Sequence, residues 1–227
     1  FTTPINRDQI HALITDLELR PDEPMASRCG QCTACLDACP TGAFDGPFAL
    51  DARRCLSYLT IEHVGSFPLS IRSNMQQRVM GCDVCQSVCP YDRSARATVM
   101  TTEVAPRPGL VGPDLARWLE MTSSDYRRIT KGTAVRRLSR TQLMRNAAIA
   151  LGNSANDRAV APLARALRTH KSALVRAHVA WALGELGGAA AQQVLRNALL
   201  HEPDGSVRQE IGFALARPTQ QDRRSEA

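Results

Sequence analysis

No cysteine follows residue 89, although the chain has 227 residues. Aromatic residues make up only 4% of the sequence, so a hydrophobic core must be built mainly from alanine, leucine and valine. No stretch approaches the ~20 apolar residues of a membrane-spanning helix, and there is no secretory signal. These absences exclude a membrane protein and a secreted disulfide scaffold. They predict a cytoplasmic globular protein with one large domain or two small ones.

The eight cysteines that are present fall into two related runs. The first run reads Cys29-x-x-Cys32-x-x-Cys35-x-x-x-Cys39-Pro40, and the second reads Cys82-x-x-Cys85-x-x-x-Cys89-Pro90, with Cys55 as its leading cysteine upstream. This spacing is typical of bacterial ferredoxins, in which the fourth cysteine of a run binds the other cluster. We therefore expect two [4Fe–4S] clusters, the first held by Cys29, Cys32, Cys35 and Cys89 and the second by Cys39, Cys55, Cys82 and Cys85.

Two other uses of these cysteines compete with the clusters. Four disulfides are disfavoured because C-x-x-C-x-x-C places three thiols too close together, and because nothing indicates an oxidising compartment. Two zinc sites are a stronger alternative, since C-x-x-C pairs also bind zinc. A zinc site, however, needs neither the third cysteine nor the repeated Cys-Pro ending, so the spacing favours iron–sulfur clusters.

Acidic residues are absent between Arg127 and Arg145, a stretch that holds seven basic residues. The formal net charge of the whole chain is +6. Such a stretch is often only a solvated helix face, but the complete absence of acids equally predicts contact with a polyanion such as nucleic acid. None of the five histidines lies in a ligand pattern, and we expect all of them to be structural.

An internal repeat dominates the second half of the chain. Val175-Arg176 recurs as Val207-Arg208, and the triplets Ala150-Leu151-Gly152 and Ala182-Leu183-Gly184 recur as Ala214-Leu215, always with a period of 32 residues. Each unit reads as helix, turn, helix, which is the signature of short HEAT-like repeats. The sequence therefore predicts a mainly α fold.

Proline and glycine place the domain boundary before these repeats, in residues 98–113. Within the cysteine-rich part, Asp51 is an expected N-cap of a helix that carries Cys55, and residues 64–74 read as a loop. The expected organisation is an N-terminal helix and linker (1–24), a ferredoxin-like double [4Fe–4S] cluster domain (25–97), a linker (98–113), an α-helical HEAT-like repeat domain (114–217) and a tail (218–227).

Four segments together resemble a known family. They are DLELRPDEPMASRCGQCTACLDACPTGAF (16–44), LDARRCLSYLTIE (50–62), GCDVCQSVCPYDR (81–93) and LMRNAAIALGN (143–153). They are similar to epoxyqueuosine reductase over roughly residues 16–217. The resemblance implies a cytoplasmic, monomeric, cobalamin-dependent iron–sulfur enzyme of tRNA modification, which reduces epoxyqueuosine to queuosine at the wobble position.

The resemblance also implies roles for individual residues. In this family two clusters relay electrons from an external donor to cobalamin, and HEAT repeats help to hold the tRNA anticodon stem-loop. Cobalamin would rest beside the second cluster, so Ser57, Glu62 and Asp83 are candidate cofactor contacts; a capping or cluster-stabilising role is the alternative for each. Glu62 lies seven residues past Cys55, on the same face of the expected helix. The expected tRNA phosphate contacts are Arg136, Arg137, Arg140 and Arg145.

One departure from the family is large. Members carry an N-terminal cobalamin-binding domain with an acidic proton donor before the first cluster, and residues 1–15 do not match it. We therefore expect no catalytic residue in this sequence. The chain itself would supply electron transfer and tRNA docking. Two alternatives stay open: a two-cluster ferredoxin-type module that passes electrons to a partner protein, and a truncated, inactive form of the reductase. A reductive dehalogenase-like enzyme fits less well, because that family lacks HEAT repeats.

Overall fold

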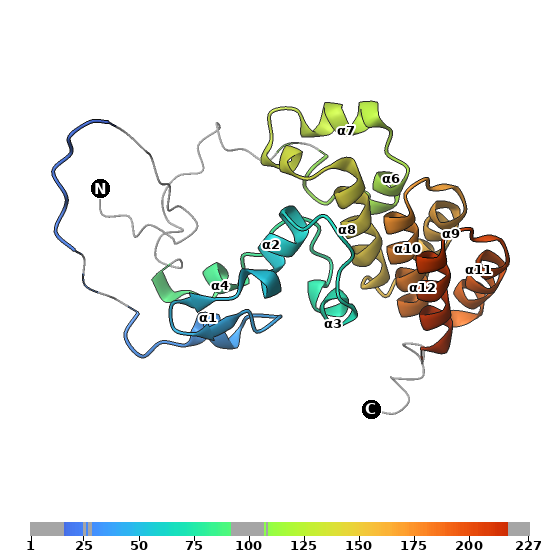
Figure 1. Cartoon of the computed structure of the whole chain (residues 1–227), viewed down its shortest axis with the longest axis horizontal. Coiled ribbons are helices and arrows are strands. Elements are labelled where there is room, and N and C mark those ends of the chain that lie inside the picture. Colours follow the sequence, from blue (N-terminus) through green and yellow to red (C-terminus); the bar gives the residue numbers. More distant parts are fainter. Residues whose placement is uncertain (1–15, 25, 27–28, 92–106, 108, 218–227) are drawn as a thin grey trace.

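The computed structural model describes residues 16–24, 26, 29–91, 107 and 109–217. Helices dominate this part of the chain, and its strands form one two-stranded hairpin. The cysteine-bearing segment, with its short helices, lies at one end of the molecule, and a stack of longer helices lies at the other (Figure 1). The predicted mainly α fold is confirmed, with the two parts in the predicted order.

Short elements joined by turns make up the cysteine segment. Its hairpin is antiparallel and pairs Phe44 with Leu50. No residue of the two short helices that carry Cys35 and Cys85 is buried, so these helices gain little from a hydrophobic core. The elements are α1 (Ala34–Asp37), β1 (Phe44–Gly46), β2 (Ala49–Leu50), the 3-10 helix η2 (Ala52–Arg54), α2 (Leu56–Ile61), α3 (Leu69–Arg72), the 3-10 helix η3 (Ser73–Met75) and α4 (Val84–Ser87).

Residues 64–74 are not the continuous loop that the sequence predicts. α3 begins directly after Pro68, and η3 extends it to Met75. Met75 is fully buried and Ile71 packs against the same core, so tertiary packing stabilises a helical segment too short to form alone. The local glycine, proline and serine content favoured a loop, and these long-range contacts overrode it.

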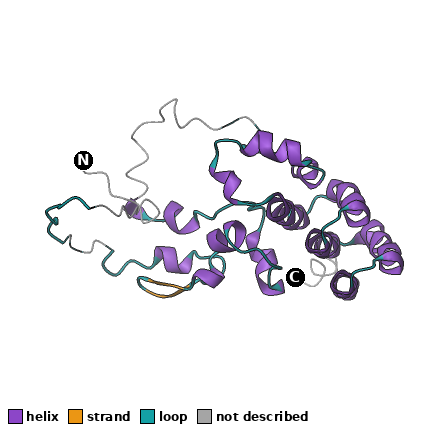
Figure 2. Cartoon of the chain, turned by 45° about the horizontal axis from the view of Figure 1, so that its top comes forward, coloured by secondary structure: helices purple, strands orange, loops and turns teal. Residues whose placement is uncertain are grey.

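The second region is a stack of helices. α10 packs between α8 and α12, while α9 and α11 pack against α10 and against each other (Figure 1). Figure 2 shows these helices, in purple, at the end of the molecule opposite the orange hairpin. Its elements are α6 (Leu115–Leu119), α7 (Ser123–Thr130), the 3-10 helix η5 (Ala134–Arg137), α8 (Arg140–Gly152), the 3-10 helix η6 (Asp157–Ala159), α9 (Val160–Thr169), α10 (Ala173–Leu186), α11 (Gly188–His201) and α12 (Gly205–Ala216).

The repeated Ala-Leu-Gly triplets mark close approaches between neighbouring helices. A β-carbon added to Gly152 would lie 2.7 Å from the Cα of Ala182. One added to Gly184 would lie 2.7 Å from the Cβ of Ala214. Each glycine thus faces the alanine 30 residues later, in the next repeat, and only a hydrogen atom fits between them. The period of the sequence is therefore also a period of helix packing.

Gly184→Ala is expected to lower the free energy of unfolding by about 1–3 kcal/mol, because the added methyl group overpacks the contact between α10 and α12. Gly212 in α12 is the matched control, since a β-carbon there meets no atom within 4 Å. Gly212→Ala should instead stabilise the protein by up to about 1 kcal/mol through its higher helix propensity. Urea unfolding followed by circular dichroism measures both, and equal stabilities would show that the stack has room at Gly184.

One hydrophobic cluster runs through both regions. Leu56, Leu59, Phe67 and Met75 from the cysteine segment belong to the same buried cluster as side chains of α8 and α10. Much of the segment between Cys55 and Cys82 is therefore held on the repeat, and the described residues of the cysteine segment form no hydrophobic cluster of their own.

Some expectations fall largely outside the described residues. Residues 16–24 contain no helix, and the rest of the expected N-terminal helix lies in 1–15. The structure describes only residues 107 and 109–113 of the expected linker and none of the tail beyond residue 217. These boundaries stay predictions. Among the helices that are described, none has the length and apolar character needed to span a membrane.

Candidate metal centre

The two cysteine motifs fold in the same way. Thr33 precedes α1 and Asp83 precedes α4, and Cys35 and Cys85 are the second residues of these helices. α1 and α4 pack against each other, so the motifs lie side by side (Figure 1). In the expected ligand scheme, Cys89 of the second motif binds the first cluster and Cys39 of the first motif binds the second. The two motifs must therefore lie side by side, as they do.

The sulfur of Cys39 lies among hydrogen-bond donors. The backbone N–H of Ala43 donates to Cys39 Sγ at 3.2 Å, and the hydroxyl of Thr41 lies 3.8 Å from the same sulfur. Burial raises the pKa of the Cys39 thiol, but hydrogen bonds from Ala43, Thr41 and Gly42 outweigh burial and hold that pKa below its usual value. Because the thiolate is the form that binds metal, these donors prepare Cys39 for ligation.

Cys55 does not lie within a helix, contrary to the prediction. Asp51 does accept a capping hydrogen bond, from the N–H of Arg53 at 3.0 Å, but it caps only η2. Cys55 separates η2 from α2 with extended backbone angles, φ −71° and ψ 124°. The sequence pattern failed here because it does not distinguish one continuous helix from two short ones that meet at Cys55.

Two hydroxyl groups of α2 hold the second motif. The N–H of Cys82 donates to Ser57 Oγ at 3.0 Å, and the N–H of Gly81 donates to Thr60 Oγ1 at 2.9 Å. Because α2 begins directly after Cys55, these bonds connect the surroundings of Cys55 and Cys82. Of the two roles that the sequence left open for Ser57, they favour stabilisation of the cluster loop.

Asp83 and Glu62, the other candidate cofactor contacts, have different surroundings. Asp83 is exposed and accepts a hydrogen bond from Gln86 Nε2 at 3.3 Å. Glu62 is exposed at the end of α2 and forms an ion pair with Arg137. Glu62 would have to exchange that partner before binding a cofactor, so Asp83 is the more available of the two.

The thiols of the chain fit two iron–sulfur clusters. Eight cysteines supply four ligands to each of two cubanes, and none is left over. In the part of the chain that the structure describes, no three His, Cys, Asp or Glu side chains gather around a single metal ion position. The fit therefore depends on the identity and spacing of the thiols, on the packing of α1 against α4, and on the donors around Cys39.

The arginines expected to bind phosphate lie in different environments. Arg136 and Arg137 are exposed in η5, where Arg137 is paired with Glu62. Arg140 is half-buried at the start of α8 and donates to the backbone oxygen of Met121 at 2.7 Å. Arg136 and Arg137 lie between α7 and α8, and Arg140 is the first residue of α8. We call residues 127–140 the basic segment.

Arg145 is fully buried, which corrects the expectation that it contacts tRNA. Its guanidinium donates to the backbone oxygens of His63 and Gly65 at 2.8 and 2.7 Å, and its Cζ lies 3.9 Å from the ring centroid of Phe67. Burial lowers the pKa of Arg145 to about 10, so it remains protonated at neutral pH. The charged guanidinium binds backbone oxygens inside the protein and offers no surface to a phosphate.

His178, in α10, binds the same loop as Arg145, at residues 63–67. The backbone N–H of Phe67 donates to His178 Nε2 at 3.2 Å, and His178 Nδ1 lies 2.7 Å from the backbone oxygen of Leu174. Burial, followed by the positive charge of Arg72, lowers the pKa of His178 to about 3. The neutral ring therefore donates from Nδ1 and accepts at Nε2, which is a structural role.

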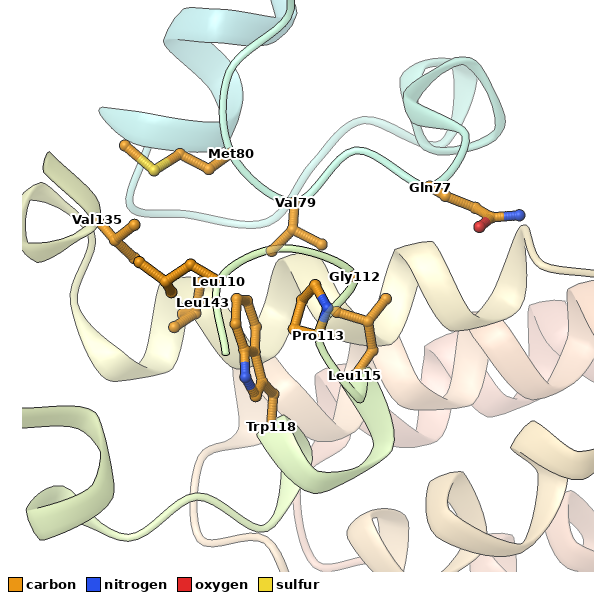
Figure 3. Close-up of a pocket in the computed structure, with 10 residues that line it drawn as sticks. All are labelled: Gln77, Val79, Met80, Leu110, Gly112, Pro113, Leu115, Trp118, Val135 and Leu143. Carbon is orange, nitrogen blue, oxygen red and sulfur yellow. The ribbon is translucent and has the colours of Figure 1, made fainter. Parts of the chain in front are cut away.

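A pocket of about 490 Å³ adjoins the second motif (Figure 3). Val79 and Met80, which precede Cys82 by a few residues, line one side, and Trp118 and Leu143 line another. The lining is predominantly apolar, so the pocket offers contact area more than specific polar contacts.

Three polar residues of α8 and its C-cap escaped the sequence analysis, namely Gln142, Asn146 and Asn153. Each donates from its side-chain amide to two backbone oxygens of the cysteine segment. Their signal is spacing, because steps of four and seven residues place them on one face of a helix that is otherwise nearly all buried.

Two families match the chain. Residues 28–92 match the family described as a 4Fe-4S double cluster binding domain, and residues 133–216 match HEAT repeats. Both matches agree with the positions of the cysteine motifs and of the helical stack.

Similar whole proteins share one description. The chain is 44% identical to an epoxyqueuosine reductase of Pseudomonas aeruginosa over 176 residues, which cover 77% of this chain and 48% of that protein. It is 38% identical to that of Escherichia coli over 173 residues, 76% of this chain and 45% of the relative. The chain thus spans about half the length of the curated relatives it matches.

Solved structures that match the chain carry the same description as these relatives. A crystal structure of selenomethionine-labelled epoxyqueuosine reductase matches with a TM-score of 0.81 and 32% identity, over 86% of this chain and 52% of that one. A structure of such an enzyme with an epoxyqueuosine-modified tRNA-Tyr stem loop matches with a TM-score of 0.78 and 32% identity, over 86% of this chain and 52% of that one.

Proposed function

Because the chain belongs to the epoxyqueuosine reductase family and spans about half the length of its relatives, we propose that it supplies electron delivery and tRNA docking to that enzyme. The reaction is the reduction of epoxyqueuosine to queuosine at the tRNA wobble position. One observation carries the proposal: a single fold joins paired cysteine motifs to a HEAT stack with an exposed basic segment. A ferredoxin-type module alone would have no use for that segment.

The cysteines set the direction of electron flow in this proposal. Bound clusters supply one-electron transfer, and cobalamin supplies the reducing chemistry at the substrate. Cys29 and Cys32 of the first site are exposed, whereas Cys55 and Cys82 are half-buried beside α2. An external electron donor would therefore approach the first cluster, and electrons would leave from the second.

Cobalamin would lie beside the second motif, where Asp83 is the exposed candidate contact. Ser57 would act on the cofactor only indirectly, because its hydroxyl accepts a hydrogen bond from the backbone N–H of Cys82. Glu62 could take part only after leaving Arg137. These differences rank the three candidate residues for mutagenesis, with Asp83 first.

The basic segment would hold the tRNA backbone. Arg136 is exposed and forms no ion pair with any residue that the structure describes, so its charge is available to a phosphate. Arg140 is half-buried and Arg137 is shared with Glu62, so both are expected to contribute less. Phosphate contacts of this kind give an affinity that depends on salt and little on sequence.

Arg136→Glu combined with Arg140→Glu is expected to weaken binding of a tRNA anticodon stem-loop. The slope of log affinity against log salt should become shallower by roughly 0.7–0.9 for each phosphate that is no longer neutralised. Filter binding at several salt concentrations measures both effects. Arg158→Glu with Arg196→Glu is the control, because it changes the charge equally at exposed positions outside the basic segment, in η6 and α11.

The control separates local contacts from net charge. Equal decreases of affinity in the two double variants would assign the effect to net charge, and an unchanged slope in the first variant would remove RNA from the proposal. The second result would favour the two-cluster ferredoxin-type alternative.

A further inference from the structure

α8 belongs to the repeat stack, yet its buried polar face is bonded to the cysteine segment. Gln142 Nε2 donates to the backbone oxygens of Ile61 and His63, both at 3.2 Å. The helix itself is fixed at its start by a capping box between Ser139 and Gln142. A rigid element of the repeat is thereby placed against the chain that links Cys55 to Cys82.

Asn146 occupies the centre of this face and has no exposed surface. Its Nδ2 donates to the backbone oxygen of Thr60 at 2.8 Å and to that of Val79 at 2.7 Å. Its Oδ1 accepts a hydrogen bond from Arg145 Nε at 3.0 Å. Both donor positions of the amide group and its oxygen are therefore used, and the orientation of the side chain is fixed.

The two carbonyl groups that Asn146 joins belong to two segments of the chain, which we call the Cys55 arm (residues 55–60) and the Cys82 arm (residues 79–82). Thr60 lies in α2, five residues after Cys55, and Val79 lies three residues before Cys82. The same two arms are also joined by the bonds from the N–H groups of Gly81 and Cys82 to the hydroxyls of α2. Asn146 thus completes a set of cross-links that sets the distance between Cys55 and Cys82.

We propose that Asn146 is a positioning residue for the second iron–sulfur cluster. It holds the Cys55 arm and the Cys82 arm at the separation that one cubane requires. The inference rests on the proposed ligand scheme, in which Cys55 and Cys82 bind the same cluster. Groups that orient metal ligands in this way typically contribute about 10–100-fold to metal affinity.

Asn153 provides a matched control at the C-terminus of the same helix. Its Nδ2 also donates to two backbone oxygens, those of Arg72 at 2.8 Å and Gln76 at 2.9 Å. Those carbonyl groups lie in α3 and just after η3, where there is no cysteine. Asn146→Leu and Asn153→Leu therefore remove the same kind of double hydrogen bond, but only the first removes it from between two cluster ligands.

The experiment follows anaerobic release of iron to a chelator from the reconstituted chain. In Asn146→Leu, about half of the iron should be released at least about tenfold faster than in the wild type. An EPR redox titration should show a shifted midpoint potential for one cluster and not for the other. Asn153→Leu should leave both rates and both potentials unchanged. Asn146→Ser, which keeps one donor, serves if the leucine variant does not fold.

Each outcome decides the proposal. Wild-type release and potentials in both Asn146 variants would overturn the positioning role while leaving the ligand scheme intact. Equal acceleration in the Asn146 and Asn153 variants would also overturn it, because the effect would then follow from reduced stability. A wild-type chain that holds far fewer than about eight iron atoms would overturn the ligand scheme and the inference together.

Discussion

Cys35→Ser is expected to remove about four of the eight iron atoms and to unfold residues 29–38, which carry three of the four ligands of the first cluster. Cys35 lies in α1, and neither α1 nor α4 contains a buried residue. With so little apolar burial, the thiolate–iron bonds must supply most of the folding free energy of these segments. Residues 56–80 should stay folded, because Leu56, Leu59 and Phe67 belong to the core shared with the repeat.

Anaerobic iron and sulfide analysis, with limited proteolysis, measures both effects. Protease sites should open in residues 29–38, while residues 39–82 and the repeat helices remain protected. Thr33→Ala, which changes an exposed residue two positions away, should keep both clusters. Full iron content in Cys35→Ser would contradict the ligand scheme.

Arg145→Met should lower the free energy of unfolding by about 3 kcal/mol or more, from two opposing effects. Hydrogen bonds from a charged donor contribute about 1.5–3 kcal/mol each, and the guanidinium makes several, to His63, Gly65 and Asn146. Against them stands the cost of burying the charge, which also lowers the pKa of Arg145 to about 10. The hydrogen bonds prevail, and methionine would leave their acceptors unpaired.

Urea unfolding provides the measurement, and Arg136→Met is the control. Arg136 is exposed, so its removal should change stability by less than about 0.5 kcal/mol. RNA binding should show the opposite order, weaker in Arg136→Met and unchanged in folded Arg145→Met. A stable Arg145→Met protein with weakened RNA binding would return Arg145 to the interface.

The sequence identified the chemistry of the cysteine motifs because iron–sulfur ligands are set by residue type and spacing. It also identified the helical repeat, since its period is a packing period in which Gly152 and Gly184 meet Ala182 and Ala214. These features are local or periodic, and short-range pattern is enough to recognise them.

The sequence could not separate the buried arginine from the exposed ones. Arg136 and Arg145 belong to one basic run, but α8 turns Arg145 towards the backbone oxygens of His63 and Gly65, which lie far earlier in the chain. Backbone oxygens carry no side-chain signature, so these partners are invisible to pattern analysis. The same holds for Asn146 and for the break in the helix at Cys55.

The continuous core limits how this protein can be taken apart by recombination. Residues 56–80 supply part of the repeat's core, yet they lie between Cys55 and Cys82 of the ligand set. Suppose that recombination replaced the cysteine segment with a ferredoxin. The chimera would either lose apolar side chains from the core of the helical stack or take its cluster ligands from two different proteins. The cysteine-bearing and helical halves are therefore expected to be inherited as one unit, because neither has a complete core without the other.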